Sequence, residues 1–165
     1  MRNRVKSGIA FGGGGTRGIA HLGVIRVLQE NNIDFDYVAG NSAGAIAGAL
    51  YAADIPWDQL YDFVLNMKEK NVLPKRPPLL SYMSPEIIER LADCFLKDMR
   101  FEDLHRPFCA VAVELNQGTL ETLCSGSVSK ALSASCAVPG VFQPVRIGDK
   151  TYIDGGTLRS IPTQE

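Results

Sequence analysis

Two glycine-rich turns near the start of the chain constrain its fold more than any other feature. The first is the run Gly-Gly-Gly-Gly-Thr-Arg-Gly at residues 12–18, and the second is Gly-Asn-Ser-Ala-Gly at residues 40–44. Each turn follows a short apolar run typical of a buried strand, and each opens a run with helical spacing of its apolar residues. This alternation predicts an α/β fold with a mostly parallel sheet covered by helices.

The rest of the chain continues with helical and hairpin patterns. The predicted elements are a helix at 84–96, a hairpin at 108–123, a small-residue helix at 127–137 and a second hairpin at 145–153. The second hairpin leads directly into Asp154-Gly155-Gly156. A length of 165 residues suits one domain, and no composition shift divides it.

Composition excludes some classes of function. The net charge of −1 gives no indication of nucleic-acid binding. No stretch approaches the roughly 18 consecutive apolar residues of a membrane span. The basic N-terminus runs into glycines rather than a long apolar region, so no signal peptide is expected. We therefore predict a cytoplasmic protein.

The four cysteines favour the same location. They form no C-x-x-C pair and no Cys/His ligand spacing, so no metal site is expected. Without a secretion signal, free thiols acting as small apolar side chains are favoured over disulfides.

An apolar stripe at helical spacing runs from Trp57 to Met67 and precedes a basic, proline-rich patch at residues 68–76. One interpretation is peripheral contact with a membrane surface. The favoured interpretation is a helix packed on the body of the protein beside a solvated loop.

The first glycine turn is suited to holding a negatively charged oxygen. Gly13, Gly14 and Gly15 lack side chains, so a substrate oxygen can approach their backbone N–H groups. The positive end of the following helix points into the same space. Arg17 either adds positive charge there or braces the loop.

The second turn reads G-x-S-x-G, with Ser42 between Gly40 and Gly44. In a strand–turn–helix context this pattern is typical of a nucleophile elbow, which exposes a serine at the top of a sheet. The alternative is that Ser42 simply caps a helix.

The spacing Gly13-x-Gly15-x-x-Gly18 also fits the dinucleotide fingerprint G-x-G-x-x-G. That fold requires an acidic residue at the end of the second strand. Asp34 and Asp36 lie instead at the start of that strand, so a nucleotide site is disfavoured.

A histidine base is the missing part of an ordinary serine hydrolase. His21 lies in an apolar helix and His105 in a polar run, and neither follows Asp154. Asp154, between an apolar strand and two glycines, is the better candidate base, because burial beside an apolar pocket would raise its pKa. The alternative for Asp154-Gly155 is a plain turn.

Four stretches together resemble the patatin-like phospholipases, of the bacterial type related to neuropathy target esterase. They are residues 12–24, residues 40–44, the segment Ala-Ser-Cys-Ala-Val-Pro-Gly-Val-Phe at 134–142, and Asp154-Gly155-Gly156. The resemblance covers nearly the whole chain and implies one acyl hydrolase domain over residues 1–165 with a three-layer α/β/α fold.

The resemblance also implies the chemistry. It assigns the nucleophile to Ser42, the base to Asp154, and the oxyanion loop to Gly13, Gly14 and Gly15 with Arg17 beside them. The implied substrates are phospholipids, lysophospholipids or other acyl esters, and no metal or cofactor is implied. Segment 134–142 would pack near the site and support it.

Two departures from the family pattern matter. Ser160 stands where the family often has asparagine, although Pro162 is kept. Family members also continue with another strand and helix, so the resemblance implies a domain shortened at its C-terminal end. The alternatives to a hydrolase are therefore a non-catalytic scaffold or fragment and, less favoured, a nucleotide-binding module. The sequence indicates no oligomeric state.

Overall fold

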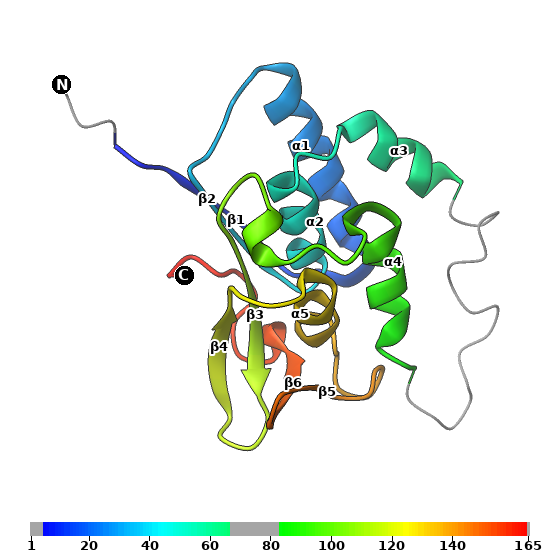
Figure 1. Cartoon of the computed structure of the whole chain (residues 1–165), viewed down its shortest axis with the longest axis vertical. Helices are drawn as coiled ribbons and strands as arrows, with labels where there is room; N and C mark the ends of the chain where they lie inside the picture. The colour runs from blue at the N-terminus through cyan, green and yellow to red at the C-terminus, as the bar shows by residue number, and fades with distance from the viewer. Residues whose placement is uncertain (1–4, 67–82, 165) are drawn as a thin grey trace.

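The computed structural model describes residues 5–66 and 83–164 (Figure 1). The strands are β1 (Gly8–Phe11), β2 (Tyr37–Asn41), β3 (Phe108–Glu114), β4 (Thr119–Leu123), β5 (Val145–Ile147) and β6 (Lys150–Asp154). The helices are α1 (Ala20–Glu30), α2 (Ala43–Ala52), α3 (Trp57–Leu65), α4 (Glu86–Leu96) and α5 (Val128–Ser135). Short 3-10 turns follow the first glycine run (η1, Gly15–Ile19), precede β3 (η2, Phe101–Asp103) and follow β6 (η3, Gly155–Thr157).

The described strands form one six-stranded mixed sheet in the order β1-β2-β3-β6-β5, with β4 also paired to β3. β1, β2 and β3 are parallel, whereas β4 and β6 run antiparallel to β3. β5 is antiparallel to β6 and therefore points the same way as β3. Four of these strands thus share one direction, and the predicted α/β class is confirmed.

Both helices with extensive sheet contacts lie on the same face. α2 packs on β1, β2 and β3, and α5 packs on β3, β5 and β6. The residues that meet them, Phe11, Val38, Phe108 and Ala110, share one side of the pleat and form a buried core. In Figure 1 the helices accordingly gather beside the sheet.

Helix α2 is apolar and almost completely buried because its small residues let it lie close to the sheet. A Cβ added at Gly48 would lie 3.0 Å from the Phe108 ring and 3.3 Å from Val38. The absence of a side chain at Gly48 therefore sets how closely the middle of α2 approaches β2 and β3.

One side of helix α3 packs against the protein, whereas Tyr61 of the predicted stripe is 51% exposed. Leu60 and Phe63 are buried, and the Arg26 guanidinium lies 4.5 Å from the centre of the Trp57 ring. This packing is the favoured interpretation of the stripe. Met67 and the basic patch at 68–76 lie outside the described residues.

The prediction of four free thiols is wrong for one pair. Cys109 on β3 and Cys124, just after β4, form a disulfide. The antiparallel register pairs Ala110 with Leu123, so the adjacent residues, Cys109 and Cys124, lie opposite each other across the hairpin. Cys94 is free and exposed, and Cys136 is free and buried.

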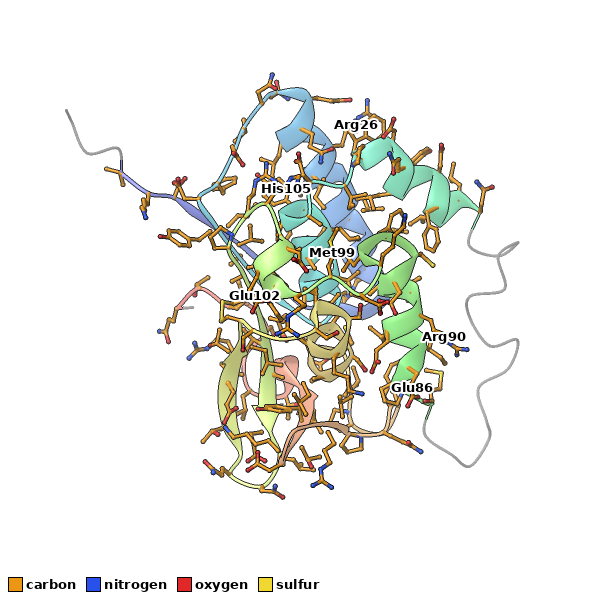
Figure 2. The ribbon with its side chains drawn as sticks, in the orientation of Figure 1. Arg26, Glu86, Arg90, Met99, Glu102 and His105 are labelled. Atoms are coloured by element: carbon orange, nitrogen blue, oxygen red, sulfur yellow. A yellow bond between two sulfur atoms is a disulfide. The ribbon has the colours of Figure 1, made fainter. Side chains whose placement is uncertain are left out.

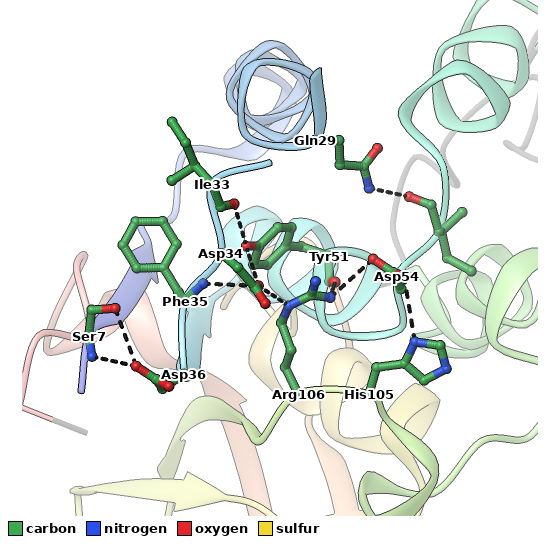
Figure 3. A network of polar contacts seen from close by, with 11 residues as sticks. Ser7, Gln29, Ile33, Asp34, Phe35, Asp36, Tyr51, Asp54, His105 and Arg106 are labelled. Carbon is green, nitrogen blue, oxygen red and sulfur yellow. Dashed lines mark hydrogen bonds and ion pairs between the residues drawn. The ribbon is translucent and has the colours of Figure 1, made fainter. Parts of the chain in front are cut away.

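A polar cluster joins the segments before β2 and β3 to the end of α2 (Figure 3). Arg106 Nε donates to Asp34 Oδ1 at 2.6 Å, and its Nη1 donates to Tyr51 O at 3.0 Å and Asp54 Oδ1 at 3.2 Å. This cluster lies at the opposite end of β2 from Ser42.

No helix in the described ranges is long and apolar enough to cross a membrane.

Candidate active site

Ser42 lies in the sharp turn between β2 and α2. Its backbone has φ 54° and ψ −127°, a conformation that residues with side chains rarely adopt. Ser42 occupies the N-cap position of α2 but makes no capping hydrogen bond with its side chain. Ser127, in contrast, caps α5 by accepting a bond from the Lys130 amide at 3.3 Å. Ser42 is therefore not an ordinary helix cap.

The two glycines that flank Ser42 are required by close backbone contacts. A Cβ at Gly40 would lie 2.5 Å from Ala45 Cα, and one at Gly44 would overlap the carbonyl oxygens of Phe11 and Gly12. Helix α2 thus starts directly against the end of β1. This is the strand–turn–helix geometry that the G-x-S-x-G pattern predicts.

The Ser42 amide is held by a side chain from a distant part of the chain. It donates to Ser135 Oγ at 2.8 Å, and the Ser135 hydroxyl in turn donates to Val111 O at 2.6 Å. Ser135 is fully buried at the last position of α5. Segment 134–142 therefore contacts the elbow, as its resemblance to the family implied.

Asp154 ends β6 on the same edge of the sheet and is 4% exposed. Its Oδ1 accepts a hydrogen bond from the Gly156 amide at 2.6 Å, and its own amide donates to Ala137 O at 3.0 Å. Its Oδ2 is buried and has no partner with hydrogen-bond geometry among the described residues. One carboxylate oxygen is thus fixed, and the other remains available as an acceptor.

The electrostatics link Asp154 to Ser42. Burial raises the pKa of the Asp154 carboxyl, while the nearby Ser42 hydroxyl and the Gly156 amide oppose part of that rise. The Cys136 thiol has its pKa raised, first by burial and then by the Asp154 charge, and it also interacts with the Ser42 hydroxyl. Serine, aspartate and a neutral thiol therefore share one buried space.

The first glycine run lies beside the elbow, because a Cβ at Gly13 would be 3.4 Å from the Ser42 Cβ. The Gly13 amide donates to Ser160 O at 2.8 Å and is occupied. The Gly14 and Gly15 amides have no acceptor among the described residues. Gly15 has φ 55° and open space around its Cα, and Arg17 is exposed. Two amides are thus free to meet a substrate oxygen.

Asn41 is a site residue that sequence reasoning missed. It is fully buried, and its Nδ2 donates to Arg159 O at 2.8 Å. A Cβ at Gly155 would lie 2.5 Å from its Oδ1. Asn41 therefore joins the elbow to the segment after β6, and the only sequence signal was a polar residue inside an otherwise small, apolar turn.

Neither histidine reaches Asp154. His21 Nε2 is 2.9 Å from Gly12 O, and its ring meets Phe11 edge-on at 5.3 Å between centroids. His105 pairs with Asp54 at 3.7 Å on the surface, in the upper half of Figure 2 and away from β5 and β6.

An apolar cavity of about 300 Å³ opens beside the glycine run. Gly15, Thr16 and Ala43 line one end, next to Ser42. The walls come from α2, α3, α4 and α5, and include Ile46, Leu50, Phe63, Phe95 and Leu132. Such a cavity suits a hydrocarbon chain rather than a charged ligand. Within residues 5–66 and 83–164 no cluster of three side chains could hold a metal ion.

Comparison with known proteins identifies the family of the chain. The family model for patatin-like phospholipase matches residues 9–165, so the chain belongs to the patatin-like phospholipase family. An uncharacterised NTE family protein from Mycobacterium bovis is 32% identical over 93% of this chain and 43% of its own length. Lysophospholipase NTE1 of Debaryomyces hansenii is 27% identical over 96% of this chain and 11% of its own.

A solved structure supports the fold. VipD from Legionella pneumophila superposes with a TM-score of 0.80 at 16% identity, covering 95% of this chain and 47% of VipD. The chain therefore has the patatin fold, and it spans less than half the length of these relatives.

Proposed function

We propose that this chain is a serine lipid acyl hydrolase in which Ser42 is the nucleophile and Asp154 is the general base. The observation that carries the proposal is a strained, elbow-held Ser42 whose hydroxyl acts on the buried Asp154 carboxyl: burial raises the pKa of that carboxyl, and the Ser42 hydroxyl lowers it in part. Within the described residues, Asp154 Oδ2 has no partner that meets hydrogen-bond geometry. Family membership and the lysophospholipase relative support the same class of reaction.

Acylation begins when the Ser42 oxygen attacks the ester carbonyl carbon and gives its proton to Asp154. The amides of Gly14 and Gly15 stabilise the negative charge that develops on the carbonyl oxygen. The tetrahedral intermediate then collapses, and the leaving alcohol takes the proton from Asp154. The product of this half-reaction is an acyl-enzyme on Ser42.

Deacylation repeats the chemistry with water. Asp154 takes a proton from the attacking water, the same two amides hold the oxyanion, and Ser42 leaves with the proton returned by Asp154. A raised pKa makes Asp154 a better base than an exposed aspartate, whose pKa is near 3.9. The apolar cavity holds the acyl chain during both steps.

The two alternatives predict different behaviour. A nucleotide module would place an acidic side chain near the glycine run, but Asp34 is bound to Arg106 at the other end of β2. A non-catalytic scaffold keeps the fold and has no turnover. An activity assay is therefore needed to distinguish a hydrolase from a non-catalytic scaffold.

Turnover of lysophospholipids and short-chain esters by the wild type, Ser42→Ala and Ser127→Ala tests the proposal. We expect Ser42→Ala to be inactive and Ser127→Ala, which loses an ordinary helix cap, to keep wild-type turnover. A folded wild-type protein that is inert toward every ester would favour the scaffold. Equal activity of wild type and Ser42→Ala would exclude Ser42 as the nucleophile.

A further inference from the structure

The strained Ser42 backbone needs a partner that holds it. A residue with a side chain in such a conformation costs about 1–3 kcal/mol and persists only where its surroundings impose it. The flanking glycines allow the turn but form no directed bond to Ser42. The Ser42 carbonyl accepts a hydrogen bond from the Ala45 amide at 2.8 Å within the first turn of α2. The Ser42 amide, on the strand side of the turn, donates to Ser135 Oγ at 2.8 Å.

The Ser135 hydroxyl is fully committed to this position. It accepts a hydrogen bond from the Ser42 amide and donates one to Val111 O at 2.6 Å. The carbonyl of Val111, in strand β3, therefore fixes the orientation of the Ser135 hydroxyl. Ser135 is 0% exposed, so water does not compete for either bond. The two hydrogen bonds from Ser42 to Ser135 and from Ser135 to Val111 thus join the elbow to the centre of the sheet.

The next two residues of the same turn reach the other half of the site. Cys136 is buried, and burial, the Asp154 charge and the Ser42 hydroxyl all act on the pKa of its thiol. Ala137 O accepts a hydrogen bond from the Asp154 amide at 3.0 Å. Ser135 and Ala137, two residues apart at the end of α5, therefore bond the backbones of Ser42 and Asp154.

We infer that Ser135 is a positioning residue for the proposed reaction: its hydroxyl holds the Ser42 backbone in the strained conformation of the elbow, from which Ser42 would give its proton to Asp154. The inference rests on the proposed function. Ser135 does not touch the substrate and acts only through Ser42. Without its hydroxyl, the Ser42 amide is left buried without an acceptor and the turn can relax.

Helix α5 offers a matched control. Ser133 is also 0% exposed, and its hydroxyl donates to Pro85 O at 3.1 Å, away from the elbow. Ser133→Ala and Ser135→Ala each remove one buried serine hydroxyl from the same helix. A difference between them in turnover therefore reports on the elbow rather than on loss of a buried hydrogen bond.

The first measurement is amide hydrogen exchange at Ser42, which needs no activity. We expect Ser135→Ala to lose protection at the Ser42 amide, Ser133→Ala to retain it, and Ser135→Thr, which keeps the hydroxyl, to retain it if the extra methyl is accommodated. Unchanged protection in Ser135→Ala would overturn the inference. A misfolded Ser135→Thr leaves the test with the alanine pair.

The second measurement is steady-state ester turnover alongside thermal unfolding. We expect Ser135→Ala to lower kcat by roughly 10- to 100-fold with little change in KM, because small misplacements of a reacting group cost that much. Ser133→Ala should lower the melting temperature without this loss of kcat. Equal kcat values in the two variants would show that Ser135 is only structural.

The wild-type arm separates the two proposals. An inert wild type that still protects the Ser42 amide would end the proposed function and, with it, the positioning role, although the contact itself would stand. An active wild type with Ser135→Ala equal to Ser133→Ala would remove the positioning role alone.

Discussion

The two glycine turns look alike in sequence, but Gly44 of the elbow and Gly15 of the first run are glycines for different reasons. In the elbow, Gly40 and Gly44 are required because backbone atoms occupy the space of a Cβ. In the first run, Gly15 has nothing within 4 Å, and its glycine is required by φ 55°. The elbow is therefore packed on both sides of Ser42. The first run is open only around Gly15, because a Cβ at Gly18 would overlap Ala43 and one at Gly13 would lie 3.2 Å from Asn41 Nδ2.

The largest effect is expected from removing the base that faces the packed turn. Asp154→Asn keeps an acceptor for the Gly156 amide but cannot take a proton, so turnover should fall by about 10³-fold. Asp149→Asn changes an exposed aspartate in the turn of the same hairpin and should keep full turnover. Full activity of Asp154→Asn in ester hydrolysis would remove the base assignment.

The same variant gives a pH prediction. Burial raises the folded-state pKa of Asp154, so its ionisation opposes folding as the pH rises through that pKa. Asp154→Asn should therefore be more stable than wild type near neutral pH, with the gap closing below the ordinary aspartate pKa. Wild-type kcat/KM should fall on the acidic side of the raised pKa. Urea unfolding and rate profiles across pH measure both, and a less stable asparagine variant at neutral pH would contradict the sign.

The next largest effect compares one glycine from each turn. Gly44→Ala forces a methyl group into the Phe11 and Gly12 carbonyls and should cost more than about 3 kcal/mol of unfolding free energy. In Gly15→Ala the added methyl group meets open space, so only the positive φ should lower the free energy of unfolding, by about 1–2 kcal/mol. Equal costs in urea unfolding would show that the two turns do not differ in this way.

A smaller effect is expected at Asn41, which ties the elbow to the segment after β6. Asn41→Ala removes the hydrogen bond that the buried Asn41 amide donates to Arg159 O and should cost about 1–3 kcal/mol. The control, Asn66→Ala, removes an exposed side chain that bonds Asp62 O, and it should be nearly neutral. An equal change of melting temperature in both variants would show that Asn41 does not stabilise the contact between the elbow and the segment after β6.

The smallest effect lies far from both turns. Arg106→Met breaks the cluster in Figure 3 and should cost about 1 kcal/mol at neutral pH, with turnover unchanged. Arg106 lowers the pKa of Asp34, so its contribution should be lost as the pH falls toward that lowered pKa. Arg100→Met, which breaks an exposed pair with Glu102, is the control. A large loss of turnover in Arg106→Met would mean that the two ends of β2 are coupled.

The sequence predicted what short-range patterns encode. Strand, turn and helix alternation gave the α/β class, and the G-x-S-x-G spacing gave the elbow because its glycines respond to backbone contacts within a few residues. Asp154 was reached by excluding the histidines, whose contacts with Gly12 and Asp54 agree with that exclusion.

Long-range contacts could not be predicted. The Cys109–Cys124 pair depends on the register between β3 and β4, which no single residue specifies. Ser135 meets the elbow across 93 residues of chain, and Gly13 is engaged by a main-chain carbonyl at Ser160. Because that contact uses the backbone, serine in place of the family's asparagine leaves it intact.

Mass spectrometry after treatment with a fluorophosphonate tests the central claim most directly. We expect a single adduct on the wild-type protein, located on the peptide that contains Ser42, and no adduct on Ser42→Ala. Labelling at another serine, or equal labelling of Ser42→Ala, would contradict it.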